Sequence, residues 1–342
     1  MNTKPDGGKR GQSSALVTGG AGFIGAHLVD HLIEDLGMSV TVLDDLSGGF
    51  EENIHPQSRF VNGSITDAAL VTKLFAETRF DYVYHLAAYA AEGLSHFIKN
   101  FNYTNNLLGS VNLINASVNT NVKCFVFTSS IAVYGANQVP MRERTRPEPE
   151  DPYGIAKYAV EMELAVTKEM FGLDYIIFRP HNVYGERQNI GDRYRNVIGI
   201  FMNNLLCGRP LPIFGDGEQR RAFTYIADII PGMAKSVFIP DARNKVFNVG
   251  SDAHHSVREL AETVIDAMGM PGEIRHVEER KEVKIAYADH AEYKRVIGQE
   301  RETPLAEGVR RMAAWVKSAG ARKSKSFGSI EIERNLPSIW KD

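Results

Sequence analysis

A glycine-rich stretch near the start of the chain places the strongest constraint on its fold. In "LVTGGAGFIGAHL", Gly19, Gly22 and Gly25 lie between an apolar run typical of a buried strand and a longer segment with helical periodicity. The first glycine permits a tight turn, the second lets a pyrophosphate approach the backbone, and the third allows close packing of strand and helix. We therefore predict a dinucleotide-binding loop, with a purely structural glycine turn as the alternative.

The rest of the chain repeats this alternation of short strands and longer amphipathic segments. Apolar runs such as "SVTVLDD", "DYVYHLAA", "KCFVFTSS" and "DYIIFRPHNVYG" are separated by segments of helical length. Continuous apolar strands between helices are typical of a parallel sheet that is covered on both faces. The sequence thus predicts an α/β fold with a doubly wound parallel sheet of the Rossmann type.

The regular alternation ends near Gly185, which suggests the domain organisation. We expect a leader at 1–14, an NAD-binding Rossmann domain at 15–185 to which later segments return, and a smaller, mixed C-terminal substrate-binding region at 186–320. The last part, 321–342, combines a basic stretch with an aromatic end. We interpret it as a packed tail or a subunit contact.

Composition excludes several classes of partner. The 342 residues carry a formal charge of -3, which gives no electrostatic reason to expect nucleic acid or a membrane surface as partner. No apolar stretch approaches the roughly 20 residues of a membrane span. Cys124 and Cys207 are too few for a disulfide framework or a zinc site, so we expect no metal and a reducing, cytoplasmic location.

Two acidic residues end the second predicted strand. Asp44 and Asp45 close "SVTVLDD", where a carboxylate accepts hydrogen bonds from an adenosine ribose and repels a 2′-phosphate. This position favours NAD over NADP. An aspartate that caps a turn is the alternative.

A tyrosine and a lysine in "DPYGIAKYAVE" are four residues apart. On a helix, Tyr153 and Lys157 would lie one turn apart on the same face. An ammonium beside a phenol stabilises the phenolate, so the pair could act as a base. Such pairs also occur on solvated helix faces, and the spacing alone does not decide between the two interpretations.

Taken in order, these motifs resemble those of the extended short-chain dehydrogenase/reductases. The resemblance rests on the glycine loop, Asp44, "HLAA" at His85–Ala88, "TSSIAVYG" at Thr128–Gly135 and the Tyr153/Lys157 pair. It runs from about Ala15 to Ser318 and is greatest to the nucleotide-sugar epimerases of the UDP-glucose/UDP-galactose type.

The resemblance implies an NAD-dependent reaction with three catalytic residues. Tyr153 would take a proton from a sugar hydroxyl while a hydride moves from C4 to the nicotinamide. Lys157 would hold the nicotinamide ribose and, with the cationic ring, lower the pKa of Tyr153. Ser130 would bond the same hydroxyl, whereas Ser129 would be a structural or cofactor contact.

Further contacts follow from the resemblance alone. Besides the glycines, Asp44, Asp45, Tyr153 and Lys157, it assigns cofactor contacts to Phe23, Ile24, Leu46, Ser47, Ser64, Ile65, Leu86, Ala87, Ala88, Asn106 and His181, with Asn106 as a buttress. Besides Ser130, it assigns contacts to a UDP-linked sugar to Asn182, Asn196, Val197, Ile213, Phe214, Arg221, Arg280 and Ala286.

The residues after Ser130 bear on the type of reaction. Related dehydratases carry an Asp-Glu pair there, because elimination needs an additional acid and base. Here Ile131 and Ala132 follow, and neither can transfer a proton. Epimerisation is therefore favoured, with a dehydratase, a 4-ketosugar reductase and a non-catalytic dinucleotide sensor as alternatives.

Several positions depart from the family pattern. Ser64 and Ala222 stand where the family usually has aspartates, Ala90 replaces a frequent lysine, and Arg280 is one position away from the family's late arginine. Ala286 replaces a bulky tyrosine of enzymes restricted to unacetylated sugars. We predict that this small side chain leaves room for a 2-N-acetyl group.

Two longer-range features complete the expectations. The segment with Glu92, Ser95 and His96 is interpreted either as a wall of the sugar pocket or as an ordinary helix start. The family resemblance also implies a homodimer, with the helices after Asn106 and Tyr153 as the contact.

Overall fold

A seven-stranded parallel sheet forms the centre of the molecule. The computed structural model describes residues 12–136, 138–279, 283–299, 301–323 and 327–341. Its strand order is β11-β6-β5-β4-β1-β2-β3, with every neighbouring pair parallel. The strands are β1 (Ser14–Thr18), β2 (Ser39–Asp44), β3 (Arg59–Asn62), β4 (Tyr82–His85), β5 (Cys124–Thr128), β6 (Tyr175–Pro180) and β11 (Lys245–Val249).

The chain order of these strands creates a switch point between β1 and β4. From β1 the chain proceeds to β2 and β3 at one edge, then returns to β4 on the other side of β1. Ligands of open α/β sheets bind outside the carboxyl ends of the strands at such a point. The predicted Rossmann-type doubly wound sheet is confirmed.

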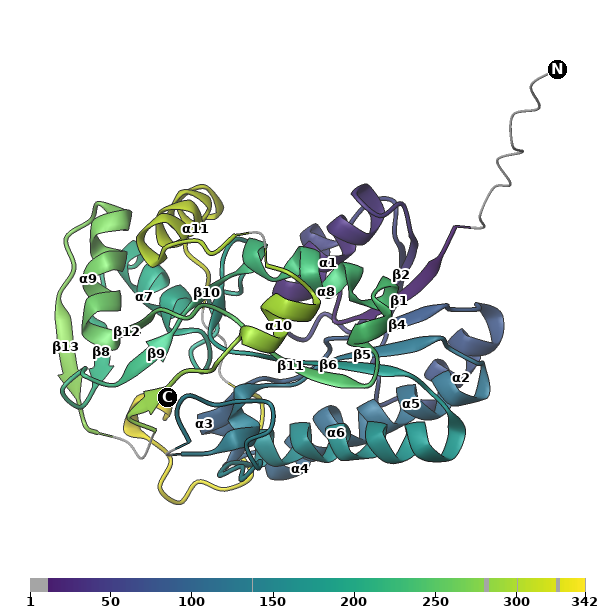
Figure 1. Ribbon diagram of the computed structural model, residues 1–342. Coiled ribbons are helices and arrows are strands. Elements are labelled where there is room, and N and C mark those ends of the chain that lie inside the picture. Colours follow the sequence, from purple (N-terminus) through teal and green to yellow (C-terminus); the bar gives the residue numbers. More distant parts are fainter. Residues whose placement is uncertain (1–11, 137, 280–282, 300, 324–326, 342) are drawn as a thin grey trace.

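Helices cover both faces of the sheet (Figure 1). One face carries α1 (Phe23–Glu34), α8 (Ile230–Lys235) and α10 (Ala291–Val296); the other carries α2 (Ala68–Glu77), α5 (Gly109–Asn119) and α6 (Pro152–Phe171). Alternate residues of β5 show how the core divides: Cys124 and Val126 pack with the first layer, and Phe125 and Phe127 with the second. Every residue of this strand is buried.

Most of the chain after β6, apart from β11, α8 and α10, builds a smaller, mixed region beside the sheet. Its helices are α7 (Val197–Leu206), α9 (Val257–Met268) and α11 (Leu305–Ala319). Its strands form small sheets: β7 (Val183–Tyr184) with β10 (Thr224–Tyr225), β8 (Leu211–Phe214) with β13 (Ile274–Val277), and β9 (Arg220–Ala222) with β12 (His254–Ser256) and β14 (Ile285–Ala286).

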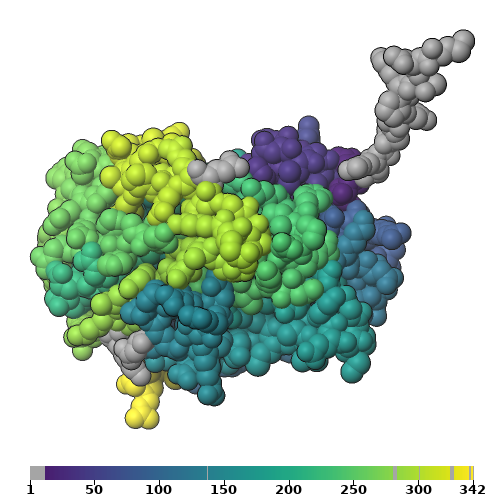
Figure 2. Space-filling view, in the orientation of Figure 1, coloured from purple at the N-terminus to yellow at the C-terminus, as the bar shows by residue number. Residues whose placement is uncertain are grey.

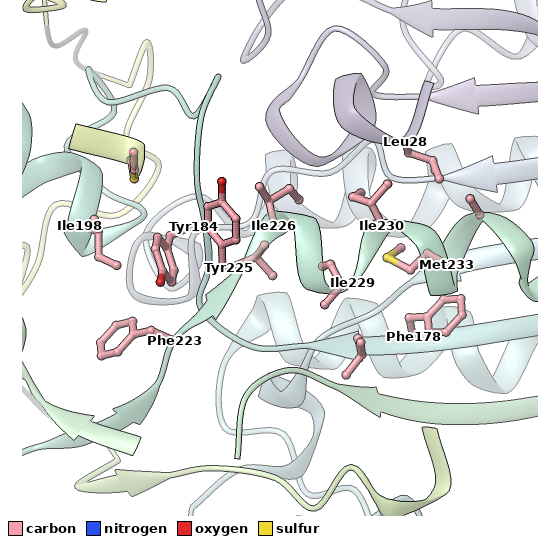
Figure 3. Packing of buried hydrophobic residues seen from close by; sticks show 14 of the residues in the cluster. Leu28, Phe178, Tyr184, Ile198, Phe223, Tyr225, Ile226, Ile229, Ile230 and Met233 are labelled. Atoms are coloured by element: carbon pink, nitrogen blue, oxygen red, sulfur yellow. The ribbon is translucent and has the colours of Figure 1, made fainter. Parts of the chain in front are cut away.

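A continuous apolar core joins this region to one face of the sheet. Figure 3 shows Leu28 of α1 and Met233 of α8 in line with Phe223 and with Ile198 of α7. All four side chains are less than 5% exposed. Shared burial of this kind fixes the mixed region relative to the strand ends.

The described part of the chain has neither a membrane-spanning helix nor a metal cluster. Its helices lack the combination of length and apolar character that a membrane crossing needs. Among the same residues, no group of three or more His, Cys, Asp or Glu side chains is arranged to hold a metal ion.

Candidate active site

The glycine loop connects β1 to α1 by a turn that excludes side chains. Gly19 has φ +74°, and a Cβ at this position would lie 2.8 Å from the Ala87 nitrogen. A Cβ at Gly25 would lie only 2.1 Å from the Gly19 oxygen. Gly22 precedes α1, whose N-terminus has no side-chain cap and no acidic residue in its first turn. The backbone N–H groups at the start of α1 are therefore suited to an anionic group.

Asp44 ends β2 next to this loop. Its carboxylate accepts hydrogen bonds from the backbone N–H groups of Ala21 (3.0 Å) and Leu46 (2.8 Å), while Asp45 accepts one from Ser47. Burial raises the pKa of Asp44, and the backbone hydrogen bonds oppose that shift. Asp44 thus braces the glycine loop as well as facing the space beside it.

A single cavity of about 1750 Å³ runs from the glycine loop to the mixed region. Pockets for one small molecule usually occupy about 300–1,000 Å³, so this cavity has room for two ligands. Most of the predicted contacts line it: Gly19, Gly22, Phe23, Ile24, Gly25, Asp44, Asp45, Ser47, Ser64, Ile65, Leu86, Ala87, Ala88, Ser130, Tyr153, Lys157, His181, Asn182, Asn196, Val197, Phe214, Arg221 and Ala286.

Three predicted contacts do not line this cavity. Leu46 lies in the turn after β2 with φ 59°, and Asn106 is 1% exposed, with its amide on Tyr89 and Asn102. Ile213 is completely buried, because Pro212 and Phe214 take the cavity face of β8. Arg280 lies outside the described residues.

The N-terminal end of α6 brings the tyrosine and the lysine together. Asp151 caps the helix by accepting a hydrogen bond from the Gly154 N–H (2.9 Å), and Pro152 occupies its first turn. The backbone N–H of Tyr153 donates to Ser95 Oγ at 3.3 Å. Lys157 Nζ donates to the Thr128 carbonyl at 2.8 Å and lies 5.7 Å from the centre of the Tyr153 ring.

Burial changes the pKa values of both side chains. It lowers the pKa of Lys157 to about 7, against an opposing effect of Glu161. It also raises the pKa of Tyr153, and Glu92 adds to that rise, while a hydrogen bond with Ser130 and the charge of Arg195 lower it. The expected lowering of the Tyr153 pKa is thus not produced by the described residues, because the cost of desolvating the phenolate exceeds the stabilisation that they provide.

The two serines before η3 (Ile131–Tyr134) have different surroundings. Ser130 caps this short helix, accepting from the Ala132 N–H at 3.1 Å, and faces the cavity. Ser129 donates to Glu161, which also accepts from Arg179 Nε at 2.9 Å. Ser129 therefore belongs to a buried polar network below the site, consistent with a structural role.

Two buried polar atoms in the cavity wall have no hydrogen-bond partner among the residues that the structure describes. They are the Thr128 hydroxyl oxygen and the Gln188 side-chain carbonyl oxygen, and both residues line the cavity. Since buried polar atoms are normally paired, these atoms suit polar groups of bound ligands. The close-fitting glycine loop and these two atoms show that the cavity lining fits a dinucleotide and a second polar ligand.

On the far side of the cavity, α7 begins with the predicted Asn196–Val197 pair. Asn196 is left-handed (φ 63°), and no side chain caps the helix. Asn182 donates its amide to the Ala222 carbonyl at 2.9 Å. Arg221 reaches the Lys284 carbonyl at 3.2 Å, and Ala286 is paired with Arg221 across β9 and β14.

The sequence analysis missed several side chains around the site. One is His290, whose Nε2 lies 2.8 Å from Nε2 of the predicted His181; burial, together with the neighbouring His290, lowers the pKa of His181 to about 3. The Arg195 guanidinium lies 4.7 Å from the centre of the Tyr89 ring. Asn335, Pro337 and Trp340 also line the cavity. No motif marks His290, Asn335, Pro337 or Trp340, and Arg195 is distinguished only by lying in an arginine-rich stretch.

Comparison with known proteins identifies the family of this chain. The model of the NAD dependent epimerase/dehydratase family matches residues 15–250. The chain is 36% identical over 302 residues to a UDP-glucose 4-epimerase of Mycolicibacterium smegmatis, covering 86% of this chain and 95% of that protein. It is 30% identical over 318 residues to dTDP-D-glucose 4,6-dehydratase of Mus musculus, with 88% of each covered.

A solved structure of an epimerase also resembles this chain in fold and sequence. The crystal structure of UDP-glucose 4-epimerase with UDP-glucose from Thermotoga maritima has a TM-score of 0.85 and 35% identity, over 90% of this chain and 99% of that one. The chain belongs to the NAD dependent epimerase/dehydratase family, and thus to the extended short-chain dehydrogenase/reductases.

Proposed function

We propose that this chain is an NAD-dependent nucleotide-sugar 4-epimerase that interconverts UDP-glucose and UDP-galactose. The observation that carries the proposal is the meeting of Ser130, Tyr153 and Lys157 in one cavity with the glycine loop. Relatives named UDP-glucose 4-epimerase support the same reaction.

The proposed roles follow from what each side chain touches. Tyr153 takes the proton of the sugar 4-hydroxyl, and Ser130, hydrogen-bonded to that phenol, holds the same hydroxyl. Lys157, anchored on the Thr128 carbonyl, supplies the remaining N–H groups to the cofactor ribose. NAD, when bound, supplies a hydride acceptor for C4 that returns the hydride to the opposite face, and a positive charge that favours the Tyr153 phenolate.

The surroundings of Ser130 favour epimerisation over dehydration. Ile131 and Ala132 follow it and line the cavity, and neither carries an ionisable group. Loss of water from the sugar needs an acid and a base beyond Tyr153. The 4-keto sugar therefore keeps its atoms and regains the hydride.

The nucleotide end is proposed to lie against α7 and the small sheets. The uncapped N-terminus of α7, with Asn182 and Arg221, suits a diphosphate, because backbone N–H groups and a guanidinium both pair with phosphate oxygens. Phe214 would lie against the base. The small side chain of Ala286 leaves room for a 2-N-acetyl substituent, so UDP-N-acetylglucosamine is a proposed additional substrate.

Product analysis tests the proposal directly. The purified protein, with NAD added, is incubated with UDP-glucose, and the product is identified by NMR. An epimerase yields UDP-galactose with no net change in absorbance of the reduced nicotinamide band. Stoichiometric appearance or loss of that band would indicate a ketosugar reductase, a 4-keto-6-deoxy product a dehydratase, and NAD binding without turnover a sensor.

A homodimer is proposed through α5 and α6. The outer face of α6 exposes Ile155, Met162, Val166 and Met170, with Leu108 next to α5. Apolar side chains recurring at this spacing mark a contact face. Met162→Lys combined with Val166→Lys should yield monomers in sedimentation velocity at concentrations where the unmodified protein is dimeric. Identical sedimentation would remove this face as the contact.

A further inference from the structure

The C-terminal segment 327–341, here called the tail, is fixed to a short helix, α4 (Lys99–Tyr103), that packs against the start of α6: Asn102 of α4 donates to the Pro152 carbonyl at 2.8 Å. The Glu331 carboxylate accepts hydrogen bonds from the backbone N–H groups of Asn100 and Phe101, both at 2.8 Å. These groups lie in the first turn of α4, which has no side-chain cap within its own sequence. Glu331 therefore supplies that cap from more than two hundred residues away. Its own backbone N–H donates to the Phe97 carbonyl at 2.9 Å.

Aromatic contacts extend this attachment to a second element. The Trp340 ring packs edge-on against Phe97 (6.2 Å between centres) and Tyr194 (5.5 Å). Phe327 similarly packs against Phe101 at 4.8 Å. Trp340 is only 8% exposed. The tail thus joins the start of α4 to the loop that precedes α7, and Figures 1 and 2 show its yellow end emerging beside the segment that contains α3 and α4.

The tail also forms part of the cavity wall. Asn335, Pro337 and Trp340 line the cavity that contains Ser130 and Tyr153. The family model matches residues 15–250, so these three residues lie outside the matched part of the chain.

The position of α3 (Glu92–Ser95) identifies which end of the cavity the tail closes. Ser95 Oγ accepts the Tyr153 N–H, and the Glu92 charge contributes to the raised pKa of the Tyr153 phenol. Phe97, against which Trp340 packs, lies two residues after the end of α3. The tail therefore borders the end with the catalytic phenol, where the sugar reacts, and not the glycine loop.

We propose that the tail is a specificity-determining part of the substrate site: Trp340, with Phe97 behind it, forms an apolar wall that holds the sugar of a nucleoside-diphosphate sugar against Tyr153 and Ser130. This inference rests on the proposed function. It requires that the tail contributes to binding of the sugar and leaves binding of the nucleotide unchanged. If the tail instead blocked the site as an autoinhibitory segment, removing its contacts would strengthen binding of the sugar nucleotide.

Separate affinities for nucleotide and sugar nucleotide test this role. Calorimetry with UDP and with UDP-glucose is performed on the NAD-loaded protein, on Trp340→Ala and on Trp340→Phe. Truncation of a buried aromatic anchor at an interface usually costs tenfold or more in affinity. We expect Trp340→Ala to lose about tenfold in affinity for UDP-glucose and less than twofold in affinity for UDP. Trp340→Phe should keep most of the difference in affinity between UDP-glucose and UDP. Equal losses for both ligands, no loss, or tighter binding would overturn the proposal.

A matched pair of glutamates tests the anchor. Glu331→Gln loses the charged cap of α4 and should raise KM for UDP-glucose about fivefold, the factor associated with loss of a helix cap, with little change in kcat. Glu333→Gln makes the same chemical change at an exposed position of the tail and should match the unmodified protein. If both variants behave alike, the tail does not act through its attachment to α4.

Intrinsic fluorescence gives a readout that needs no turnover. The chain has two tryptophans, and Trp315 on α11 does not line the cavity. In Trp315→Phe, emission therefore reports on Trp340 alone. UDP-glucose should shift this emission more than UDP does, and an equal response to both would contradict the inference.

The unmodified protein separates the two ways of failing. If it binds UDP-glucose and turns it over while the tail variants match it, the tail proposal fails alone. If it binds no UDP-sugar at all, the proposed function fails and the tail proposal fails with it.

Discussion

The two halves of the cavity are built by different means. The half around the glycine loop is formed by the carboxyl ends of neighbouring strands in one seven-stranded sheet, so backbone hydrogen bonds fix its residues. The half around α7, called the substrate half because the sugar nucleotide is proposed to bind there, is formed by sheets of two or three strands, by loops and by the tail, which are fixed mainly by side-chain contacts. The first arrangement suits the proposed reaction centre, whose geometry is fixed by the sheet. The second suits the proposed choice among sugars, because its side chains can change without disturbing the sheet.

This difference separates the expected effects of substitutions. Changes at the strand ends should alter the rate or the stability for every substrate. Changes in the other half should alter the preference among substrates while the chemistry continues. Substitutions at Tyr153, Glu161, Lys157 and Ala286 test this difference.

Tyr153→Phe should have the largest effect on turnover. It removes the group proposed to take the proton and keeps the ring in its buried position, so kcat should fall by about 10²–10⁴-fold for all UDP-sugars. Initial rates with UDP-glucose and UDP-galactose measure this. Tyr158→Phe, on the same helix and outside the cavity lining, is the control. Turnover by Tyr153→Phe at the unmodified rate would place the chemistry elsewhere.

Glu161→Gln should have the largest effect on stability. The Glu161–Arg179 pair is buried, with both side chains 4% exposed, and Arg179 also donates to the Tyr134 hydroxyl at 2.6 Å. Removing one charge leaves the other buried and unpaired, which costs about 3–5 kcal/mol in the free energy of unfolding.

Urea unfolding of the ligand-free protein measures this loss. Glu169→Gln, an exposed position on the same helix, should stay within about 0.5 kcal/mol of the unmodified protein. If Glu161→Gln is as stable as its control, the network below Ser129 does not hold the strand ends in place.

How much the sequence could predict also differs between the halves. The glycine loop, Asp44 and the Tyr153/Lys157 spacing each follow from rules about backbone geometry within a few residues, and the structure brings these residues to one cavity. Ile213 shows the opposite case. Which side of β8 faces the cavity depends on its pairing with β13, and a single short strand does not reveal that register.

The sequence suggests a packed tail, but neither its point of attachment nor the pKa values could be predicted from it, for a related reason. Glu331 caps α4 across more than two hundred residues, so no local pattern links the two. The pKa of Tyr153 depends on burial beneath α3, which exists only after the chain has folded. Contacts of long sequence separation thus decide the details of the substrate half.

Lys157 makes the stability of the ligand-free protein depend on pH. In the unfolded chain a lysine keeps its proton to about pH 10.4, whereas burial lowers the pKa of Lys157 to about 7 in the folded protein. Between these values the unfolded state binds more protons, so the free energy of unfolding rises with pH, and the cost of burying the lysine is complete below pH 7.

The expected rise is roughly 2–3 kcal/mol between pH 7 and pH 9, relative to Lys157→Met. Urea unfolding at a series of pH values measures the difference in slope. Lys73→Met, on the exposed face of α2, should keep the slope of the unmodified protein. Parallel curves for the unmodified protein and Lys157→Met would show that the lysine is not buried as a neutral amine.

Ala286→Tyr should have the smallest effect on the chemistry and should act on only one substrate. Ala286 is 7% exposed and lines the cavity among Ile131 and Met141, so a tyrosine there would occupy space next to the sugar. Overpacking by a side chain costs about 1–3 kcal/mol, which corresponds to about fivefold to 150-fold in kcat/KM for UDP-N-acetylglucosamine. The kcat/KM for UDP-glucose, which has no acetyl group, should change by less than threefold.

Ala286→Ser, which adds one atom, is the control and should retain both activities. Thermal unfolding of the three proteins shows whether the tyrosine is accommodated. Equal losses for both sugars in a stably folded Ala286→Tyr would mean that this wall does not distinguish them, and that the substrate half is as fixed as the sheet beside it.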